Sequence, residues 1–200
     1  MKNNIVIVSG LPRSGTSMMM RMLEAGGIPP FTDTLRQADP DNPRGYYEYE
    51  PVKRLDQDAS WMGSAAGHAL KVISSLLKYL PPHHNYSVIF VNRAVEEILA
   101  SQQAMLHRRV KQGEIDPTTI TPQRLDQENE VLFQTYTRHV QQTHHWLMAQ
   151  KNINTLIVEH RGTLENPITT AQQINSFLVE ELDTTAMANA VEKQLYRQRI

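Results

Sequence analysis

The sequence contains no cysteine, so disulfide bonds, thiol chemistry and cysteine-ligated zinc are excluded. It also lacks an excess of charge, because 20 Lys and Arg residues are balanced by 21 Asp and Glu residues. Without a global basic field we expect no nucleic-acid partner and no membrane partner, and any anion site must be local. No apolar run approaches the length of a transmembrane helix, and the first run is too short for a signal peptide. We therefore expect a soluble, cytoplasmic protein.

The hydrophobic pattern predicts strands alternating with helices. A chain of 200 residues with 40% hydrophobic content suits one globular domain, residues 1–200, with a sizeable core. Short apolar runs predict strands at 5–9, 69–73, 87–92 and 154–159. Longer periodic segments predict helices at 17–25, 51–62, 94–111 and 167–182, and a long helix that ends near residue 150. The alternation implies a three-layer α/β/α fold with a mainly parallel sheet, in which ligands bind at the carboxyl ends of the strands.

A glycine-bracketed loop follows the first predicted strand and precedes the first predicted helix. It consists of Gly10, Leu11, Pro12, Arg13, Ser14, Gly15, Thr16 and Ser17. In such a loop the backbone N–H groups and the positive end of the helix dipole point at one place and hold an anion there. An ATP-binding loop has a lysine directly after its second glycine. Here Thr16 stands at that position, and the cation of the loop is Arg13.

The run from Pro12 to Ser17 resembles the 5′-phosphosulfate loop of sulfotransferases, which usually reads Pro-Lys/Arg-Ser-Gly-Thr-Thr/Ser. Those enzymes move a sulfuryl group from 3′-phosphoadenosine-5′-phosphosulfate (PAPS) to a hydroxyl or amine and release 3′-phosphoadenosine-5′-phosphate (PAP). The resemblance implies a P-loop-type sulfotransferase fold and a 5′-phosphosulfate site in the loop. A glycine-bearing turn after an edge strand, or a degenerate ATP site, is the alternative.

A second segment, from Arg93 to Ser101, follows the predicted strand 87–92. Ser101 lies slightly over two helical turns after Arg93, so both residues face the same side. The segment resembles the Arg-x-x-x-Asp-x-x-x-Ser segment of sulfotransferases, with Glu97 at the acidic position. The resemblance implies that Arg93 and Ser101 bind the 3′-phosphate of the nucleotide. Alternatively, Arg93 is a helix-start residue paired with Glu97.

The end of this strand also argues against an ATPase or a nucleotide kinase. Those enzymes need an acidic residue at a strand end to organise Mg²⁺. The strand here ends in Asn92 and Arg93, so a cation stands where a metal-holding carboxylate would be expected.

Two weaker segments bear on the transfer step. The segment 69–72, followed by Leu80 and Pro81, resembles the lysine strand of sulfotransferases. It implies that Lys71 contacts the transferring group, whereas a solvated lysine at a strand end is the alternative. The segment 42–48 resembles an Asn-Pro-Lys/Arg-Gly-aromatic-x-Glu segment of small bacterial sulfotransferase-like proteins.

The chain departs from the sulfotransferase pattern at three places. Met18 stands where the mammalian cytosolic branch has a tryptophan that stacks on adenine. Val72 and Ile73 follow Lys71, although the family has a catalytic histidine two residues beyond its lysine. A glycine-rich basic loop that closes over the nucleotide is missing, and its nearest substitute is the tail around Arg197. The alternative for that tail is a frayed terminus.

The acceptor must lose a proton, so a general base is expected. We favour Glu48, which follows an aromatic pair in the segment expected to line the acceptor side. Glu48 instead has a purely structural role if it only precedes the helix expected at 51–62 and complements its dipole. His68 is a weak candidate, and the pairs 83–84 and 144–145 are expected to be solvated surface histidines.

These observations predict a sulfotransferase that uses PAPS as co-substrate, releases PAP and requires no metal. The expected catalytic residues are Arg13, Glu48 and Lys71. The expected nucleotide-binding residues are Gly10–Ser17, Arg93, Ser101 and Arg197. A small molecule of unknown identity is the acceptor, and a homodimer is possible. A P-loop nucleotide or small-molecule kinase, or a nucleotide-binding module without catalysis, is the alternative.

Overall fold

The computed structural model describes residues 4–33, 35, 39, 45–116 and 122–192, with the side chains of 122–128 left out. Within them, four strands form one sheet: β1 (Asn4–Ser9), β2 (Ala69–Lys71), β3 (Asn85–Asn92) and β4 (Ile153–Glu159). The order is β2-β1-β3-β4, and every neighbouring pair is parallel. The expected α/β class with a parallel sheet is confirmed.

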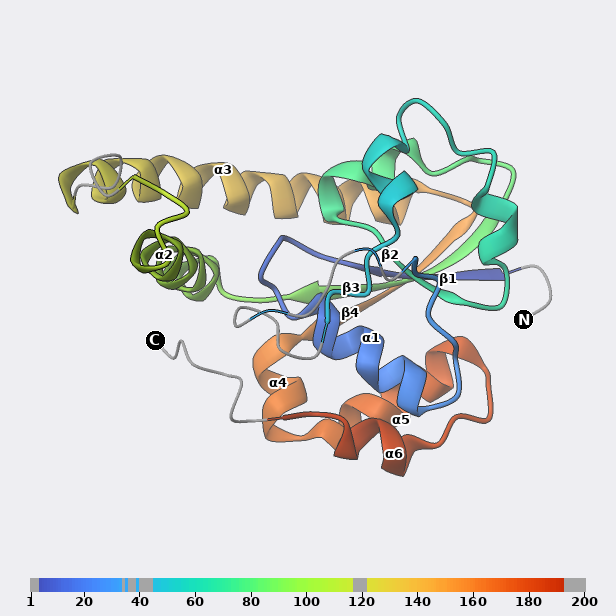
Figure 1. The fold of residues 1–200 in the computed structure, drawn as a ribbon. Coiled ribbons are helices and arrows are strands. Elements are labelled where there is room, and N and C mark those ends of the chain that lie inside the picture. Colours follow the sequence, from blue (N-terminus) through green and yellow to red (C-terminus); the bar gives the residue numbers. More distant parts are fainter. Residues whose placement is uncertain (1–3, 34, 36–38, 40–44, 117–121, 193–200) are drawn as a thin grey trace.

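Helices cover both faces of the sheet (Figure 1). One layer contains α1 (Thr16–Ala25), α4 (His160–Glu165), α5 (Pro167–Leu178) and α6 (Thr184–Asn189). The other layer contains the long helix α3 (Pro122–Ala149) and the 3₁₀ turns η1 (Glu50–Arg54), η2 (Met62–Ala65) and η3 (Ser74–Tyr79). Helix α2 (Val95–Lys111) runs beside α3, and the two project beyond the sheet as an arm (Figure 1).

The strands are apolar on both sides because both faces of the sheet are covered. Ile5, Val6, Ile7 and Val8 are all fully buried, and they divide between two cores. Ile5 and Ile7 pack into the core beneath α3 and the 3₁₀ turns. Val6 and Val8 pack on the other side, against the buried methionines of α1 and against α5. The alternation of side chains along a strand produces this division.

The helix expected at 51–62 is wrong, because this segment forms only the short turns η1 and η2. Between them Asp58 bonds locally. Its carboxylate accepts the backbone N–H of Ser60 at 2.9 Å, and its carbonyl accepts the indole N–H of Trp61 at 3.2 Å. Such local bonds compete with the helical ladder.

The carboxyl-terminal region also differs from expectation. Helix α5 ends at Leu178 rather than at 182, because Val179 adopts a left-handed conformation (φ 55°). The pattern did not predict α4 or α6, each of which has six residues. The backbone N–H of Ala186 donates to the Asp183 side chain at 2.8 Å, which caps α6. Helices this short carry too little periodicity to be recognised.

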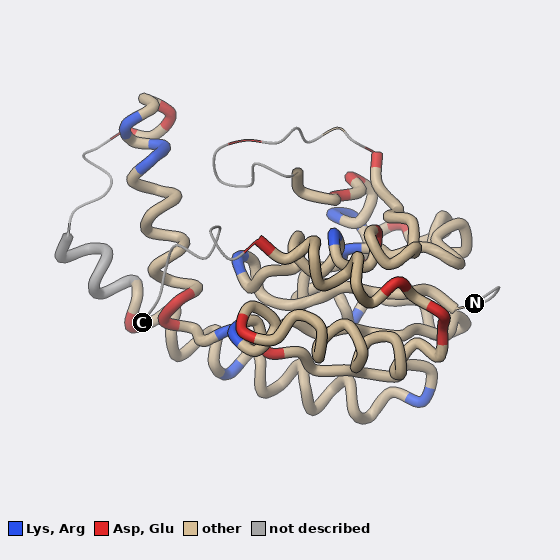
Figure 2. Tube along the Cα trace, turned by 90° about the horizontal axis from the view of Figure 1, so that it is seen from below, with Lys and Arg blue, Asp and Glu red and all other residues tan. Residues whose placement is uncertain are grey.

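Charge is distributed without a dominant sign in the part of the chain that the structure describes. Figure 2 shows acidic and basic positions interspersed along the tube. Among the described helices, none combines the length and the apolar character needed to cross a bilayer.

The two-core arrangement predicts that substitution of Met22 by alanine destabilises the protein strongly. Met22 is fully buried in α1, whereas Met148 on α3 is 84% exposed. We expect Met22→Ala to lower the free energy of unfolding by about 2–5 kcal/mol and Met148→Ala to change it by less than about 0.5 kcal/mol. Urea unfolding followed by circular dichroism measures both. Equal effects for the two variants would contradict the assigned packing.

Candidate active site

The candidate site lies where the sheet reverses its order. Strand β1 has β2 on one side and β3 on the other, and all three end at the same edge. The loop 10–15 follows β1, and Arg93 follows the neighbouring strand β3. Ligands in parallel α/β sheets bind at such a switch point, outside the carboxyl ends of the strands.

The glycines of the loop allow a close fold that other residues would block. Gly10 has φ 152°, and a Cβ there would collide with Ser14 Oγ and come within 2.7 Å of the Val91 carbonyl oxygen. Gly15 has φ 104°, and a Cβ there would collide with the ring of His160. Gly15 also occupies the N-cap of α1 without a side-chain cap. The start of the helix is therefore open toward an anion.

Ser14 supports the same conclusion. It is 1% exposed, and no described group hydrogen-bonds to its Oγ. A buried hydroxyl without a partner costs free energy, and a phosphate or sulfate oxygen bound in the loop is an acceptor of the right kind for it. The loop therefore fits a bound phosphate or sulfate group.

The loop touches the segment that follows β3. Arg13, in a left-handed conformation (φ 72°), donates from Nε to Ser101 Oγ at 3.1 Å. In return, Arg93 donates from Nη1 to the carbonyl oxygen of Arg13 at 2.9 Å. The structure thus brings together Arg13, Arg93 and Ser101, which the sequence assigned to two ends of one nucleotide.

Arg93 also pairs with Glu97, the second of the two interpretations that the sequence left open. Arg93 Nε lies 2.9 Å from Glu97 Oε2, and both side chains are less than 10% exposed. The pair lines a hollow of about 300 Å³ at the ends of β3 and β4. The hollow is lined by Asn92, Arg93, Ala94, Glu96, Glu97, Glu159 and Arg161. A phosphate bound by Arg93 would compete with the carboxylate of Glu97.

Lys71 lies inside the site. Its side chain is 9% exposed, so the alternative of a solvated lysine at a strand end is wrong. Nζ donates to Ser17 Oγ at 3.2 Å and to the carbonyl oxygen of Tyr46 at 2.6 Å. It also lies 4.0 Å from Glu48 Oε1. Lys71 therefore joins Ser17, at the start of α1, to the segment 45–49.

The segment 45–49 is held by hydrogen bonds from two of its three tyrosines. Tyr46 donates its hydroxyl to the carboxylate of Asp39 at 2.7 Å. Tyr47, with φ 53°, donates its hydroxyl to Glu24 Oε2 on α1 at 2.6 Å. Burial and this hydrogen bond raise the pKa of Tyr47. Because both tyrosines are fixed, Glu48 stays beside Lys71.

His160 is a site residue that the sequence reasoning missed. It is 6% exposed at the start of α4, and its ring packs against Gly15. Burial, reinforced by the nearby charge of Arg93 and opposed by Glu97, lowers its pKa to about 4. One signal for it was present, because His160 directly follows a strand end at the edge where ligands bind.

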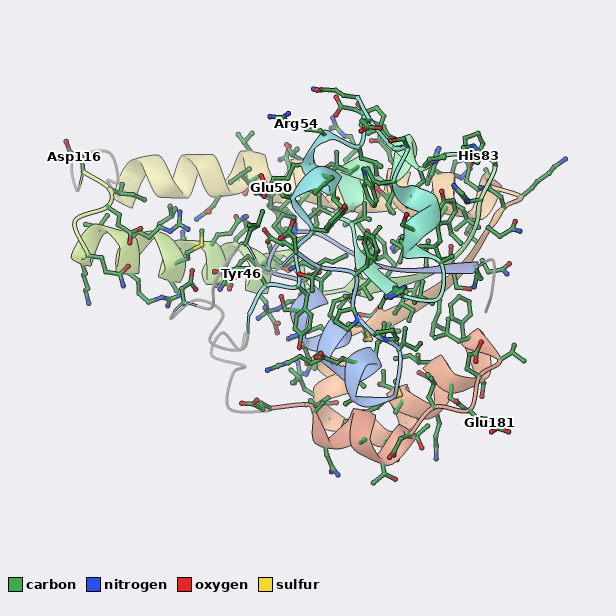
Figure 3. The ribbon with its side chains drawn as sticks, turned by 45° about the vertical axis from the view of Figure 1, so that its right-hand side comes forward. Tyr46, Glu50, Arg54, His83, Asp116 and Glu181 are labelled. Carbon is green, nitrogen blue, oxygen red and sulfur yellow. The ribbon has the colours of Figure 1, made fainter. Side chains whose placement is uncertain are left out.

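Other expected residues lie elsewhere. Arg197 is outside the described residues, as are 42–44. Figure 3 places Tyr46 on the side from which the α2–α3 arm projects, and His83 on the opposite side. His145 is exposed, as expected, whereas His144 contacts the buried Phe90 ring with 4.7 Å between ring centroids.

The chain resembles known proteins in its fold rather than in its sequence. Neither a protein-family profile nor a curated protein sequence matches the chain. Solved structures do match. The sulfotransferase domain of the Synechococcus PCC 7002 olefin synthase has a TM-score of 0.57 at 14% identity, covering 98% of this chain and 79% of its own. Sulfotransferase STF9 from Mycobacterium avium has a TM-score of 0.55 at 13% identity, covering 94% and 68%.

A third match is mouse sulfotransferase SULT7A1 in complex with PAP, with a TM-score of 0.50 at 16% identity. This match covers 98% of the chain described here but only 64% of the mouse protein. At such identities the similarity concerns the arrangement of strands and helices. The chain therefore has the fold of the sulfotransferases.

The burial of His160 predicts a pH dependence of stability. A histidine ordinarily titrates at 6.5, so between pH 6.5 and 4 the unfolded chain binds a proton that the folded protein does not. Stability therefore falls as the pH drops through this window. We expect His160→Gln to remove on the order of 2–3 kcal/mol of this pH-dependent loss, measured by urea unfolding at pH 7.5 and 4.5. The exposed His145→Gln serves as the control, and identical pH profiles for both variants would refute the assignment.

Proposed function

We propose that this protein is a sulfotransferase that moves a sulfuryl group from PAPS to a hydroxyl or amine of a small-molecule acceptor. One observation carries the proposal: the cation of the phosphate loop, Arg13, contacts Ser101, and Arg93 returns a hydrogen bond to the loop. The two segments that we assign to anion binding therefore lie side by side, which supports binding of a nucleotide phosphorylated at two positions. The shared fold supports the proposal, and one of the similar structures, mouse SULT7A1, is complexed with PAP.

The loop Gly10–Ser17 is assigned to the 5′-phosphosulfate. The open N-terminus of α1 and the Ser14 hydroxyl supply donors to its oxygens. Arg93 and Ser101 are assigned to the 3′-phosphate. Arg197 remains a further expected contact to the nucleotide, and a homodimer also stays a prediction.

The transfer is an in-line displacement at sulfur. The acceptor oxygen or nitrogen forms a bond to sulfur while the bond from sulfur to the phosphate oxygen breaks. The electron pair of the broken bond stays on that phosphate oxygen, which leaves as part of PAP. We assign Arg13 and Lys71 to the stabilisation of this negative charge, since preorganised donors are the main source of stabilisation in group transfer.

A direct test compares nucleotides and then acceptors. Isothermal titration with PAP and with ATP·Mg²⁺ separates a PAPS-dependent enzyme from a kinase, and we expect binding of PAP only. Radiolabelled PAPS is then incubated with 2-naphthol, 1-octanol and tyramine, and labelled sulfate esters or sulfamates are separated by thin-layer chromatography. PAP binding without any product would indicate a nucleotide-binding module, and preference for ATP·Mg²⁺ would indicate a kinase.

The role of Arg93 predicts a selective loss of affinity. Arg93→Ala removes a charge-assisted contact to the 3′-phosphate, which typically contributes about 1.5–3 kcal/mol. We expect the Kd for PAP to rise roughly tenfold to a hundredfold. The Kd for adenosine-5′-phosphosulfate, which has no 3′-phosphate, should rise much less. Arg161→Ala is the control, since Arg161 lines the same hollow but pairs with Glu165 in an exposed position. Equal losses for both nucleotides would exclude the assigned role.

Glu48 is the general base that the sequence predicts, and Glu48→Gln tests it. A base contributes roughly 10²–10⁴-fold to the rate, so turnover should fall by that factor while the affinity for PAP stays unchanged. Glu50→Gln is the control, because Glu50 is exposed and pairs with Lys53. Unchanged turnover in Glu48→Gln would leave Glu48 only the task of holding Lys71.

A further inference from the structure

A serine and a histidine from distant parts of the chain meet beside the phosphate loop. Ser74 begins η3, three residues after Lys71, and its backbone N–H donates to the carbonyl oxygen of Gly10 at 3.0 Å. Its Oγ lies 2.8 Å from Nε2 of His139 on α3. Ser74 is 4% exposed. The backbone bond to Gly10 thus ties this pair to the first residue of the loop.

A second set of contacts connects His139 to the other side of the loop. One turn before His139 on α3, the Tyr136 hydroxyl accepts a hydrogen bond from Gln102 Nε2 at 3.1 Å. Gln102 directly follows Ser101, to which Arg13 of the loop donates. The contacts therefore run from the loop to α2, from α2 to α3, and from α3 through Ser74 back to the loop. Figure 1 shows α3 and η3 on the same side of the sheet.

The surroundings of His139 suit a proton acceptor. Thr143 Oγ1 lies 3.4 Å from Nε2, the nitrogen that Ser74 also contacts. Among the described residues nothing hydrogen-bonds to Nδ1. Burial, and to a smaller extent the charge of Lys78, lower the pKa of His139, so the ring is neutral at pH 7. A neutral imidazole carries a proton on one nitrogen and a lone pair on the other.

Glu48, by comparison, is engaged with a cation. Its carboxylate lies 4.0 Å from Lys71 Nζ, so the negative charge of Glu48 is engaged in an ion pair with that cation. Taking up a proton would weaken that pair. His139 has no such pairing partner among the described residues, since its ring nitrogen contacts the hydroxyls of Ser74 and Thr143.

We propose that His139, rather than Glu48, is the general base of the reaction, and this inference rests on the function proposed above. Ser74 is a positioning residue whose Oγ accepts a hydrogen bond from the Nε2–H group, which keeps the proton on Nε2 and the lone pair on Nδ1. As the acceptor oxygen bonds to sulfur, its proton passes to Nδ1 and gives an imidazolium. PAP leaves with the electron pair of the broken bond, and the imidazolium returns its proton to solvent. Glu48 then orients Lys71.

The test uses the full chain, radiolabelled PAPS and the panel acceptor that the wild type sulfates fastest. We expect His139→Ala to lower kcat by roughly 10²–10⁴-fold and to leave the Kd for PAP within about twofold. Added imidazole should restore part of the lost turnover, which a purely structural role would not allow. His145→Ala, an exposed histidine on the same helix, is the matched control. Ser74→Ala should lower kcat by about tenfold without changing PAP binding, because the tautomer is no longer fixed.

The outcomes separate the inference from the function on which it rests. A wild type that binds no PAP or transfers no label to the panel overturns the proposed function, and the inference falls with it. An active wild type whose His139→Ala variant keeps its kcat, or loses it without imidazole rescue, overturns the inference alone. If Glu48→Gln then shows the full loss, Glu48 is the base.

Discussion

The candidate site depends on two hydrogen bonds between the segments that follow the neighbouring strands β1 and β3. Arg13 bonds the side chain of Ser101, and Arg93 bonds the backbone of Arg13. Neither bond could form if the ends of β1 and β3 were not adjacent and parallel, with Ser9 opposite Phe90. The parallel sheet therefore brings together two short motifs that lie 80 residues apart in sequence, and the loop receives its conformation partly from α2.

The two buried cations of the site each lie beside a carboxylate. Arg93 has Glu97 as a counter-ion, and Lys71 has Glu48. Both cations are largely buried, and a buried cation requires compensation by a nearby carboxylate or by hydrogen bonds. The two acidic residues thus keep the cations in place. A bound anion would have to compete with these carboxylates for the cations, because neither cation lacks a counter-ion.

The sequence predicted the strands and the loop correctly where the local residue pattern and the tertiary environment agree. The runs around Ile7 and Phe90 are apolar because the sheet is covered on both faces, and the loop after β1 carries its own glycines. Local pattern misled at 51–62, where Asp58 bonds its neighbours instead of continuing a helix. The contact of Ser74 with His139 spans 65 residues and depends on the packing of α3, so no local signal could have predicted it.

The pairing of Arg93 with Glu97 has a consequence for how the site selects an anion. Because the carboxylate cancels most of the long-range attraction of the guanidinium, little field extends beyond about one Debye length of 8–10 Å. Small inorganic anions are then drawn in weakly, however abundant they are. Selection passes to groups that engage several donors at once at short range, which makes shape, more than ionic strength, the determinant of what stays bound.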